Sequence, residues 1–132
     1  MASVLVIDDE ADVRASIRQV LGRVGFDVVT ADNGVSGIEE FFKRPADVVI
    51  VDVIMPRSNG VEVIKTIRAT FPGARIIAIS GGGQIGPLGY KPGAIKTEAY
   101  LAAASESGAD AVMGKPFHRT ELIALVRSLV KN

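Results

Sequence analysis

Residues 4–10 read Val-Leu-Val-Ile-Asp-Asp-Glu and residues 48–52 read Val-Val-Ile-Val-Asp, so two short apolar runs both end in acid. A third run, residues 75–80, reads Arg-Ile-Ile-Ala-Ile-Ser and ends in a hydroxyl. Continuous β-branched runs without polar alternation are typical of strands covered on both faces, as in a parallel sheet. Shorter apolar runs at 28–30 and 111–113 fit two further strands. The pattern therefore predicts five strands.

Helical patterns separate these strands. Apolar residues recur at helical spacing over 13–24, 38–42, 63–71 and 122–129, and glycine or proline follows closely after each of the first three stretches. The Ala-rich stretch 97–107 is also compatible with a helix. Strands that alternate with helices indicate a parallel, right-handed βαβ ladder, which places the chain in the α/β class.

The composition limits the classes of protein to consider. The 132 residues suit one domain, and 48% hydrophobic residues can build one core. Because 15 Lys and Arg balance 15 Asp and Glu, no net charge draws the chain to nucleic acid or to an anionic membrane. The absence of cysteine excludes disulfides, zinc-thiolate sites and a cysteine nucleophile. With no secretory signal or membrane-spanning run, we expect a cytoplasmic single domain over 1–132, without an effector domain.

Polar residues follow the strands at the points where they end. Asp8 and Asp9 follow the first strand, Asp52 ends the third, Ser80 ends the fourth, and Lys115 follows the fifth. Because the carboxyl ends of parallel strands meet at one edge of the sheet, we expect these side chains to converge. Each residue alone has a plain structural explanation as a turn, cap or loop residue. Their joint occurrence indicates a functional site.

The combination of residue types points to phosphoryl chemistry with a metal ion. Three crowded carboxylates repel one another unless a cation neutralises them, and an oxygen-only donor set favours Mg²⁺. A carboxylate beside Mg²⁺ can attack phosphorus and form an aspartyl phosphate. Lys115 and the ion would then balance charge on the transferring oxygens, and Ser80 would hydrogen-bond one of them.

The sequence resembles the receiver domain of two-component response regulators, of the single-domain chemotaxis-regulator type, over nearly its whole length. The motifs that carry the resemblance are Val-Leu-Val-Ile-Asp-Asp-Glu (4–10), Asp52-Val-Ile-Met55-Pro56 with Gly60 beyond it, Ile-Ile-Ala-Ile-Ser80, and Lys115-Pro116-Phe117. The resemblance implies a flavodoxin-like, doubly wound, five-stranded parallel sheet of order 2-1-3-4-5, with helices on both faces. It also implies that Gly60 begins the third helix.

The resemblance also implies a role for each residue at this edge of the sheet. Asp52 would be the phosphoacceptor and a metal ligand. Asp9 would bind Mg²⁺ directly, Asp8 would bind it through water, and the backbone carbonyl of Ile54 would complete the protein ligands. Ser80 would be the switch hydroxyl. By the same resemblance, the lysine that follows the fifth strand would contact the phosphoryl group.

The expected function is phosphorylation-dependent signalling. A sensor histidine kinase or a histidine phosphotransfer protein would donate the phosphoryl group, and output would be contact with a downstream protein or onward phosphotransfer. We expect no nucleic-acid or membrane partner, a monomer or weak homodimer, and no enzymatic activity beyond autophosphorylation and slow self-dephosphorylation. The alternative is a phosphorylation-independent scaffold. A haloacid-dehalogenase-type phosphatase would need a second Asp two residues after the nucleophile, where Ile54 stands.

Two features depart from the usual receiver pattern near the switch hydroxyl. Val112 stands where the family often carries Tyr or Phe, and a β-branched side chain is too short and stiff to swing between buried and exposed positions. The glycine-rich stretch 81–93 lengthens the connection after Ser80. It is either an ordinary surface insertion or part of a loop, 81–96, that becomes ordered when Ser80 moves toward phosphate.

A third departure concerns the lifetime of the phosphorylated form. Ile54 and Gly82 occupy the positions that flank the path of the hydrolytic water in the family, and neither side chain can hydrogen-bond that water. We therefore expect slow self-dephosphorylation. The sole histidine, His118, is expected to be solvated near the start of the last helix. Arg57 and Arg68 are also expected to be solvated.

Overall fold

A computed structural model describes residues 2–55, 58–80, 102–115 and 117–130. Within these ranges the chain alternates between strands and helices, as the sequence pattern predicts. The elements are β1 (Ser3–Ile7), α1 (Ala11–Arg23), β2 (Asp27–Ala31), α2 (Gly34–Lys43), β3 (Val48–Asp52), β4 (Ile54–Met55), β5 (Ser58–Asn59), α3 (Gly60–Thr70), β6 (Arg75–Ser80), β7 (Ala111–Gly114) and α5 (Arg119–Val130).

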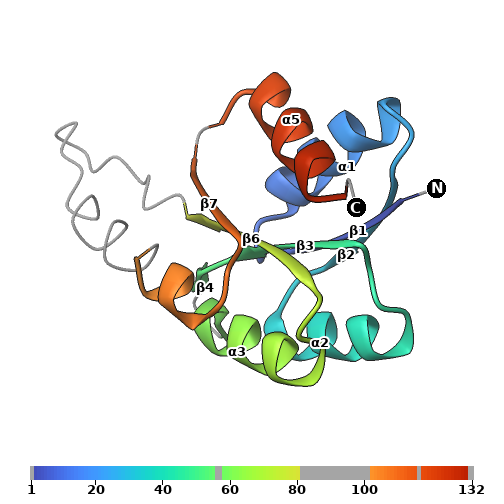
Figure 1. The fold of residues 1–132 in the computed structure, drawn as a ribbon. Helices are drawn as coiled ribbons and strands as arrows, with labels where there is room; N and C mark the ends of the chain where they lie inside the picture. Colours follow the sequence, from blue (N-terminus) through green and yellow to red (C-terminus); the bar gives the residue numbers. More distant parts are fainter. Residues whose placement is uncertain (1, 56–57, 81–101, 116, 131–132) are drawn as a thin grey trace, which may run out of the picture.

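Five parallel strands form one sheet in the order β2-β1-β3-β6-β7 (Figure 1). Since β6 and β7 are the fourth and fifth strands of this sheet along the chain, the predicted order 2-1-3-4-5 is confirmed. The register aligns Ile7 with both Ala31 and Val51, and it aligns Asp52 with Ile79. The carboxyl ends of β1, β3 and β6 therefore lie level at one edge of the sheet.

Helices cover both faces of the sheet (Figure 1), and their apolar side chains are buried against the strands in two clusters. On one face α2 and α3 bury Phe41, Ile64 and Ile67 against the strands. On the other face α1 and α5 bury Ile17 and Leu122. Both faces of the strands are covered, which is the reason their sequences are continuously apolar. No helix in the described ranges combines the length and hydrophobicity that a membrane crossing requires.

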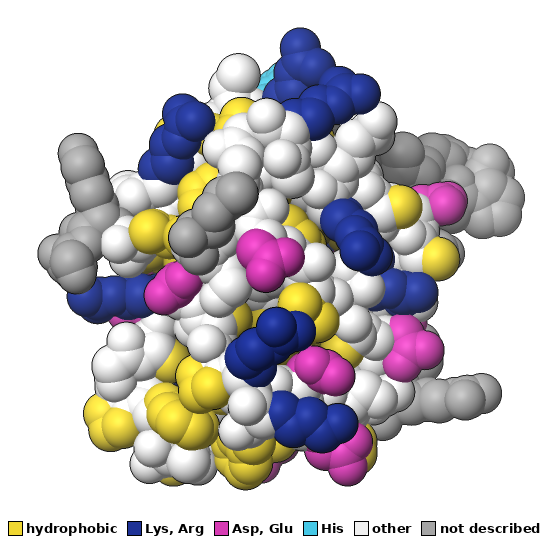
Figure 2. All heavy atoms as spheres, turned by 90° about the vertical axis from the view of Figure 1, so that its right-hand side faces the viewer, with side chains coloured by type: hydrophobic (Ala, Val, Ile, Leu, Met, Phe, Trp, Pro, Cys, Tyr) yellow, Lys and Arg dark blue, Asp and Glu magenta, His cyan; other side chains and the backbone are white. Residues whose placement is uncertain are grey.

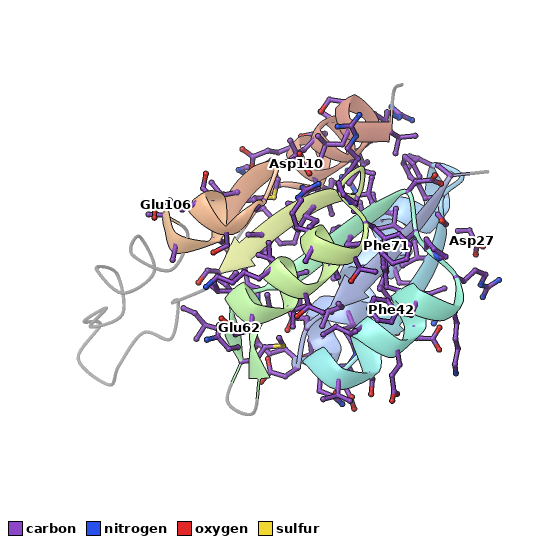
Figure 3. The ribbon with its side chains drawn as sticks, turned by 60° about the horizontal axis from the view of Figure 1, so that its bottom comes forward. Asp27, Phe42, Glu62, Phe71, Glu106 and Asp110 are labelled. Atoms are coloured by element: carbon purple, nitrogen blue, oxygen red, sulfur yellow. The ribbon has the colours of Figure 1, made fainter. Side chains whose placement is uncertain are left out.

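Aromatic contacts join α2 to α3 at the end of the molecule opposite the site. The ring of Phe71, which follows α3, meets that of Phe41 edge to face at a centroid distance of 4.9 Å. Phe71 also lies 5.8 Å from the ring of Phe42, which is partly exposed on α2 (Figure 3). These contacts fix the two helices against each other, because edge-to-face pairs are favoured by the ring quadrupole.

The helices predicted over 13–24, 38–42, 63–71 and 122–129 are confirmed, and the ends of α1, α2 and α3 show how terminal backbone groups are satisfied. The side chain of Asn33 accepts the N–H of Ser36 at 2.8 Å at the start of α2. At the start of α3, the side chain of Asn59 accepts the N–H of Val61 at 2.9 Å. Asparagine is among the residues most favoured at this position. After α1, Gly25 adopts a φ of 97°, a left-handed conformation that favours glycine.

Two short strands were not predicted from the sequence, and one predicted helix is described only in part. β4 and β5 pair antiparallel, with Ile54 opposite Asn59. Strands of two residues are too short to show a hydrophobic period, so no pattern marks them. Of the predicted helix 97–107, residues 102–107 are helical, and residues 97–101 lie outside the described part of the chain.

The expectation that Arg68 is solvated is wrong, because its side chain is only 25% exposed and its guanidinium group is fully engaged. It donates to the carbonyl oxygens of Gly108 (2.6 and 3.1 Å), Pro72 (2.7 Å) and Ala74 (2.6 Å), and to Asp110 Oδ2 (2.8 Å). One side chain thereby ties α3 to the turn that leads into β7. No sequence pattern predicts these contacts, since two of the partners lie 40 and 42 residues away.

Replacing Arg68 with alanine is expected to lower the free energy of unfolding by about 2–3 kcal/mol, because charge-assisted hydrogen bonds to partly buried carbonyls are lost. Urea denaturation followed by circular dichroism measures this change. Lys65→Ala on the same helix is the control, since its exposed ion pair with Glu62 contributes at most about 1 kcal/mol. An equal loss in the two variants would show that the contacts of Arg68 do not stabilise the fold.

Candidate functional site

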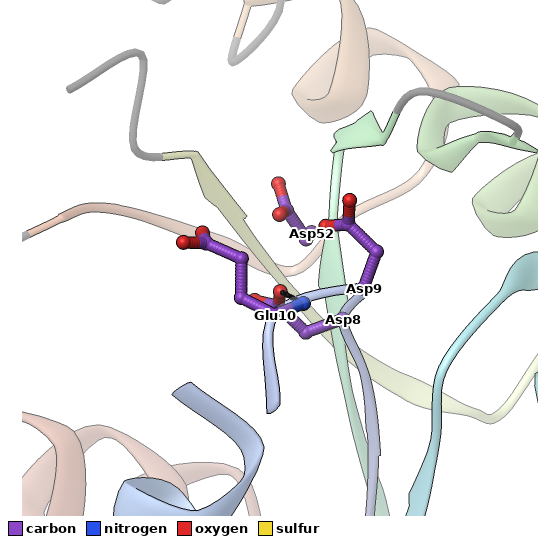
Figure 4. Close-up of side chains that lie close together, drawn as sticks. All are labelled: Asp8, Asp9, Glu10 and Asp52. Carbon is purple, nitrogen blue, oxygen red and sulfur yellow. Dashed lines mark hydrogen bonds between the residues drawn. The ribbon is translucent and has the colours of Figure 1, made fainter. Parts of the chain in front are cut away.

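Four carboxylates converge at the carboxyl edge of the sheet. Asp8, Asp9 and Glu10 come from the turn between β1 and α1, and Asp52 comes from the end of β3 (Figure 4). Their oxygen atoms can be chosen so that all lie within 4.8 Å of one another. The convergence of the three aspartates agrees with the sequence analysis. Glu10 was missed, although its place directly after two predicted ligands was a signal that it would lie near them.

Asp8 is completely buried, and its position is fixed by local hydrogen bonds. Its backbone N–H donates to the carbonyl of Ala31 at 3.1 Å, which continues the pairing of β1 with β2. Its Oδ1 atom accepts the N–H of Glu10 at 2.8 Å, the dashed line in Figure 4. This bond tightens the turn that carries three of the four acids. Asp9 is exposed, so the two neighbouring aspartates occupy different environments.

Lys115 is the cation of the site, and its side chain is only 12% exposed. Its Nζ atom lies 3.0 Å from Asp8 Oδ2, 3.1 Å from Glu10 Oε1 and 3.2 Å from Asp52 Oδ2. Its backbone N–H donates to the carbonyl of Ser80 at 3.0 Å, which anchors it beside the end of β6. Burial alone would lower the pKa of Lys115, but the charges of Asp52 and Asp8 outweigh burial and raise it above its ordinary value.

Asp52 is 2% exposed, and both of its carboxylate oxygens have partners. The N–H of Ile54 donates to Oδ1 at 2.9 Å, and the ammonium of Lys115 donates to Oδ2 at 3.2 Å. Burial is the largest influence on this group and raises its pKa from 3.8 to about 6, because these two donors offset only part of the lost hydration. Asp52 is thus a buried carboxylate held in one orientation.

Ser80 is the last residue of β6 and is completely buried. It lies one position beyond Ile79, which pairs with Asp52 across the sheet. Its Oγ atom has no hydrogen-bond partner within the described ranges. A buried hydroxyl without a partner is uncommon in folded proteins, and the cost of leaving it unpaired is recovered when a ligand supplies an acceptor.

The donor set suits a hard divalent cation. Asp8 Oδ2 contacts Lys115 as an ion pair but accepts no hydrogen bond in the described part of the chain, so a buried anionic oxygen remains available. Among the described residues, Lys115 is paired with Asp8, Glu10 and Asp52, and Asp9 lies beside them, so the carboxylates outnumber the ammonium group that pairs with them. Oxygen atoms are the ligands that Mg²⁺ prefers, and such sites use one or two carboxylates with waters. The residues present therefore fit the ion that the sequence analysis expected.

The remaining predicted positions are placed as follows. Ile54 lies in β4, two residues after Asp52, and its side chain is partly exposed. Val112 is 43% exposed on β7, at the edge of the sheet. His118 is exposed just before α5, as expected. Arg57 lies outside the described ranges. So do residues 81–96, which are the subject of the hypothesis that this loop becomes ordered on phosphorylation.

Gly60 brings the start of α3 against the acceptor strand. A Cβ atom at this glycine would meet the backbone carbonyl oxygen of Asp52 and the Cα atom of Val53. Both neighbours are backbone atoms next to the acceptor, so a larger residue would have to displace this segment. Gly60 also begins α3, as the sequence analysis expected.

Comparison with known proteins identifies the same family. Residues 4–88 match the response regulator receiver domain. The chain is 30% identical over 128 residues to the response regulator MprA of Mycobacterium sp. (strain KMS), which covers 97% of this chain and 50% of that relative. The chain therefore spans about half the length of the curated relatives that it matches.

Solved structures share the fold over almost the whole chain. NtrX from Brucella abortus superposes with a TM-score of 0.84 at 25% identity, covering 99% of this chain and 27% of that one. A response regulator receiver domain protein from Clostridium thermocellum superposes with a TM-score of 0.83 at 26% identity, covering 98% of this chain and 94% of that one. The resemblance inferred from the motifs is confirmed. With its five-stranded parallel sheet and the acidic site at its edge, the chain belongs to the response regulator receiver domain family.

Proposed function

We propose that this receiver domain accepts a phosphoryl group on Asp52 in a Mg²⁺-dependent reaction. The observation that carries the proposal is the environment of Asp52. It is a buried carboxylate with a raised pKa, held by Lys115 and by the N–H of Ile54. Beside it, two buried atoms have no hydrogen-bond partner within the described ranges: Ser80 Oγ, and Asp8 Oδ2, which is held only by its ion pair with Lys115. An incoming phosphoryl group and a cation would satisfy both atoms.

In the proposed reaction, the residues of the site have separate roles. A carboxylate oxygen of Asp52 attacks phosphorus, the bond from phosphorus to the donor histidine nitrogen breaks, and that nitrogen keeps the bonding electron pair. Lys115 turns from the carboxylates to the phosphoryl oxygens, whose charge it balances. Ser80 donates its hydroxyl to one of these oxygens. Asp8, Asp9, Asp52 and the carbonyl of Ile54 would hold Mg²⁺, which supplies the remaining charge neutralisation.

The phosphodonor would be a sensor histidine kinase or a histidine phosphotransfer protein, as the family's place in two-component signalling implies. Output would be contact with a downstream protein or onward phosphotransfer, with no turnover of a diffusible substrate. Charges of both signs are interspersed on the face shown in Figure 2, so this face offers no single-sign surface for nucleic acid. We place the protein in the cytoplasm, as a monomer or weak homodimer.

Acetyl phosphate with Mg²⁺ is expected to phosphorylate the wild type and to leave Asp52→Asn unlabelled, because an amide cannot form the acyl phosphate. Intact-mass spectrometry measures the added phosphoryl group. Asp12→Asn is the matched control, since Asp12 is exposed on the first turn of α1, outside the carboxylate group, and should leave labelling unchanged. Equal labelling of Asp52→Asn, or labelling of the wild type in EDTA, would contradict the proposal. No labelling of the wild type would favour a phosphorylation-independent scaffold.

In metal-free protein, Asp52→Asn is expected to raise the free energy of unfolding at neutral pH. Folding raises the pKa of Asp52 from 3.8 to about 6, so ionisation of the folded protein costs stability as the pH rises through this interval. The increase in the free energy of unfolding over the wild type should be small below pH about 4 and should reach at most about 3 kcal/mol above pH 6. Urea denaturation in EDTA across this range measures it, and added Mg²⁺ should narrow the difference.

The control for this experiment is Glu39→Gln, which neutralises an exposed carboxylate on α2. The difference in free energy of unfolding between Glu39→Gln and the wild type should stay constant across the pH range. If Asp52→Asn follows the same flat profile, the carboxylate of Asp52 is not penalised by burial in the folded protein.

Self-dephosphorylation is expected to be faster in Ile54→Asn than in the wild type. Ile54 lies two residues after the acceptor, and its apolar side chain cannot orient an attacking water, whereas an amide can. The decay of the phosphorylated protein, followed by intact-mass spectrometry after removal of acetyl phosphate, measures this rate. Val35→Asn on the exposed surface of α2 is the control and should decay as the wild type does. A wild-type half-life no longer than that of Ile54→Asn would show that Ile54 does not protect the acyl phosphate.

A further inference from the structure

The turn between β1 and α1 has to hold mutually repelling groups together. It carries three of the four carboxylates of the site, and like charges at short distance favour a looser arrangement. Lys115 attracts these groups from the β7 side of the site, through Asp8 and Glu10. These contacts of Lys115 are with side-chain oxygens, so they do not hold the backbone of the turn directly. The structure places a second cation at the turn.

Arg14 binds the backbone of the turn at two points. Its Nη1 atom donates to the carbonyl oxygen of Asp8 at 2.8 Å. Its own backbone N–H donates to the carbonyl oxygen of Glu10 at 3.1 Å, the first hydrogen bond of α1. The side chain of Arg14 is partly buried, so it reaches back from the first turn of the helix across the acidic turn. The carbonyl of Asp8 lies beyond the paired residues of β1, and Arg14 satisfies it.

The charge of Arg14 has no carboxylate partner among the described residues, since its one recorded side-chain bond goes to a carbonyl. A guanidinium group is always charged in proteins, and one whose partner is a backbone carbonyl acts through geometry as well as charge. Arg18, one helical turn further along α1, is exposed. The two arginines therefore carry the same charge on the same helix, but among the described contacts Arg14 binds the turn and Arg18 does not.

We infer that Arg14 is a positioning residue for the metal and phosphoryl site: by binding the carbonyl of Asp8, it holds the 8–10 turn in the geometry that brings the carboxylates together. The inference rests on the proposed function. A positioning role and a purely electrostatic role of Arg14 predict opposite changes in Mg²⁺ affinity when Arg14 is replaced. Removing a positive charge beside an acidic site should tighten Mg²⁺ binding, whereas losing the geometry should weaken it.

The experiment compares the wild type, Arg14→Met, Arg14→Lys and Arg18→Met in two measurements. Isothermal titration calorimetry with MgCl₂ should give a dissociation constant about tenfold higher in Arg14→Met, recovered largely in Arg14→Lys and unchanged in Arg18→Met. Hydrogen exchange in EDTA should show faster exchange of the Glu10 amide, which donates to Asp8 Oδ1, in Arg14→Met alone. Amides inside β1 should keep their wild-type exchange rates and so report an intact fold.

The outcomes separate this inference from the proposed function. Binding of Mg²⁺ by Arg14→Met as tight as or tighter than by the wild type would overturn the positioning role. If the wild type itself binds no Mg²⁺, the proposed function fails at its metal, and exchange of the Glu10 amide still decides the role of Arg14: an unchanged rate overturns it. If Arg14→Met does not fold, Arg14→Gln takes its place in both measurements, with the same expected direction.

Discussion

The site depends on the balance between one buried ammonium group and the carboxylates around it. Lys115 contacts Asp8, Glu10 and Asp52 within 3.2 Å, and these contacts keep the pKa of the lysine above its ordinary value despite burial. They do not compensate the lost hydration of Asp52, whose pKa is raised. Within the described part of the chain, the site therefore holds more carboxylate groups than the ammonium of Lys115 can neutralise. That excess makes it receptive to a divalent ion.

These groups lie close together because the sheet aligns the carboxyl ends of its strands at one edge. The register of β1, β3 and β6 places the residues after Ile7, Val51 and Ile79 at the same edge, and the helices close both faces beneath them. The supporting contacts are backbone contacts in large part. The N–H of Ile54 orients Asp52, and Gly60 allows α3 to begin directly against the backbone of the acceptor strand. This frame holds Asp8, Asp52 and Ser80 in buried positions at the edge of the sheet.

Much of this arrangement could be predicted from the sequence, because the strands are buried on both faces and their ends are marked by acids. The strands, the helices and the convergence of Asp8, Asp9 and Asp52 followed from that pattern, and the strand order followed from the resemblance to receiver domains. Three features were missed. The paired strands β4 and β5 are too short to have a period, Glu10 is marked only by its place directly after Asp8 and Asp9, and Arg68 meets partners about 40 residues away. Each of these depends on distances in space that hydrophobic periodicity does not encode.

The sequence by itself determined which chemical groups stand at the strand ends, since alternation of apolar runs and helical stripes sets the fold class. It also determined that Val112 stands where the family often carries Tyr or Phe, and that an apolar residue, Ile54, lies two positions after the acceptor. Only the tertiary structure decided which atoms face one another. The ion pairs of Lys115, the burial of the Ser80 hydroxyl and the bond from Arg14 to Asp8 depend on strand register and helix placement. Hydrogen bonds depend steeply on distance and angle, so residue types alone do not specify them.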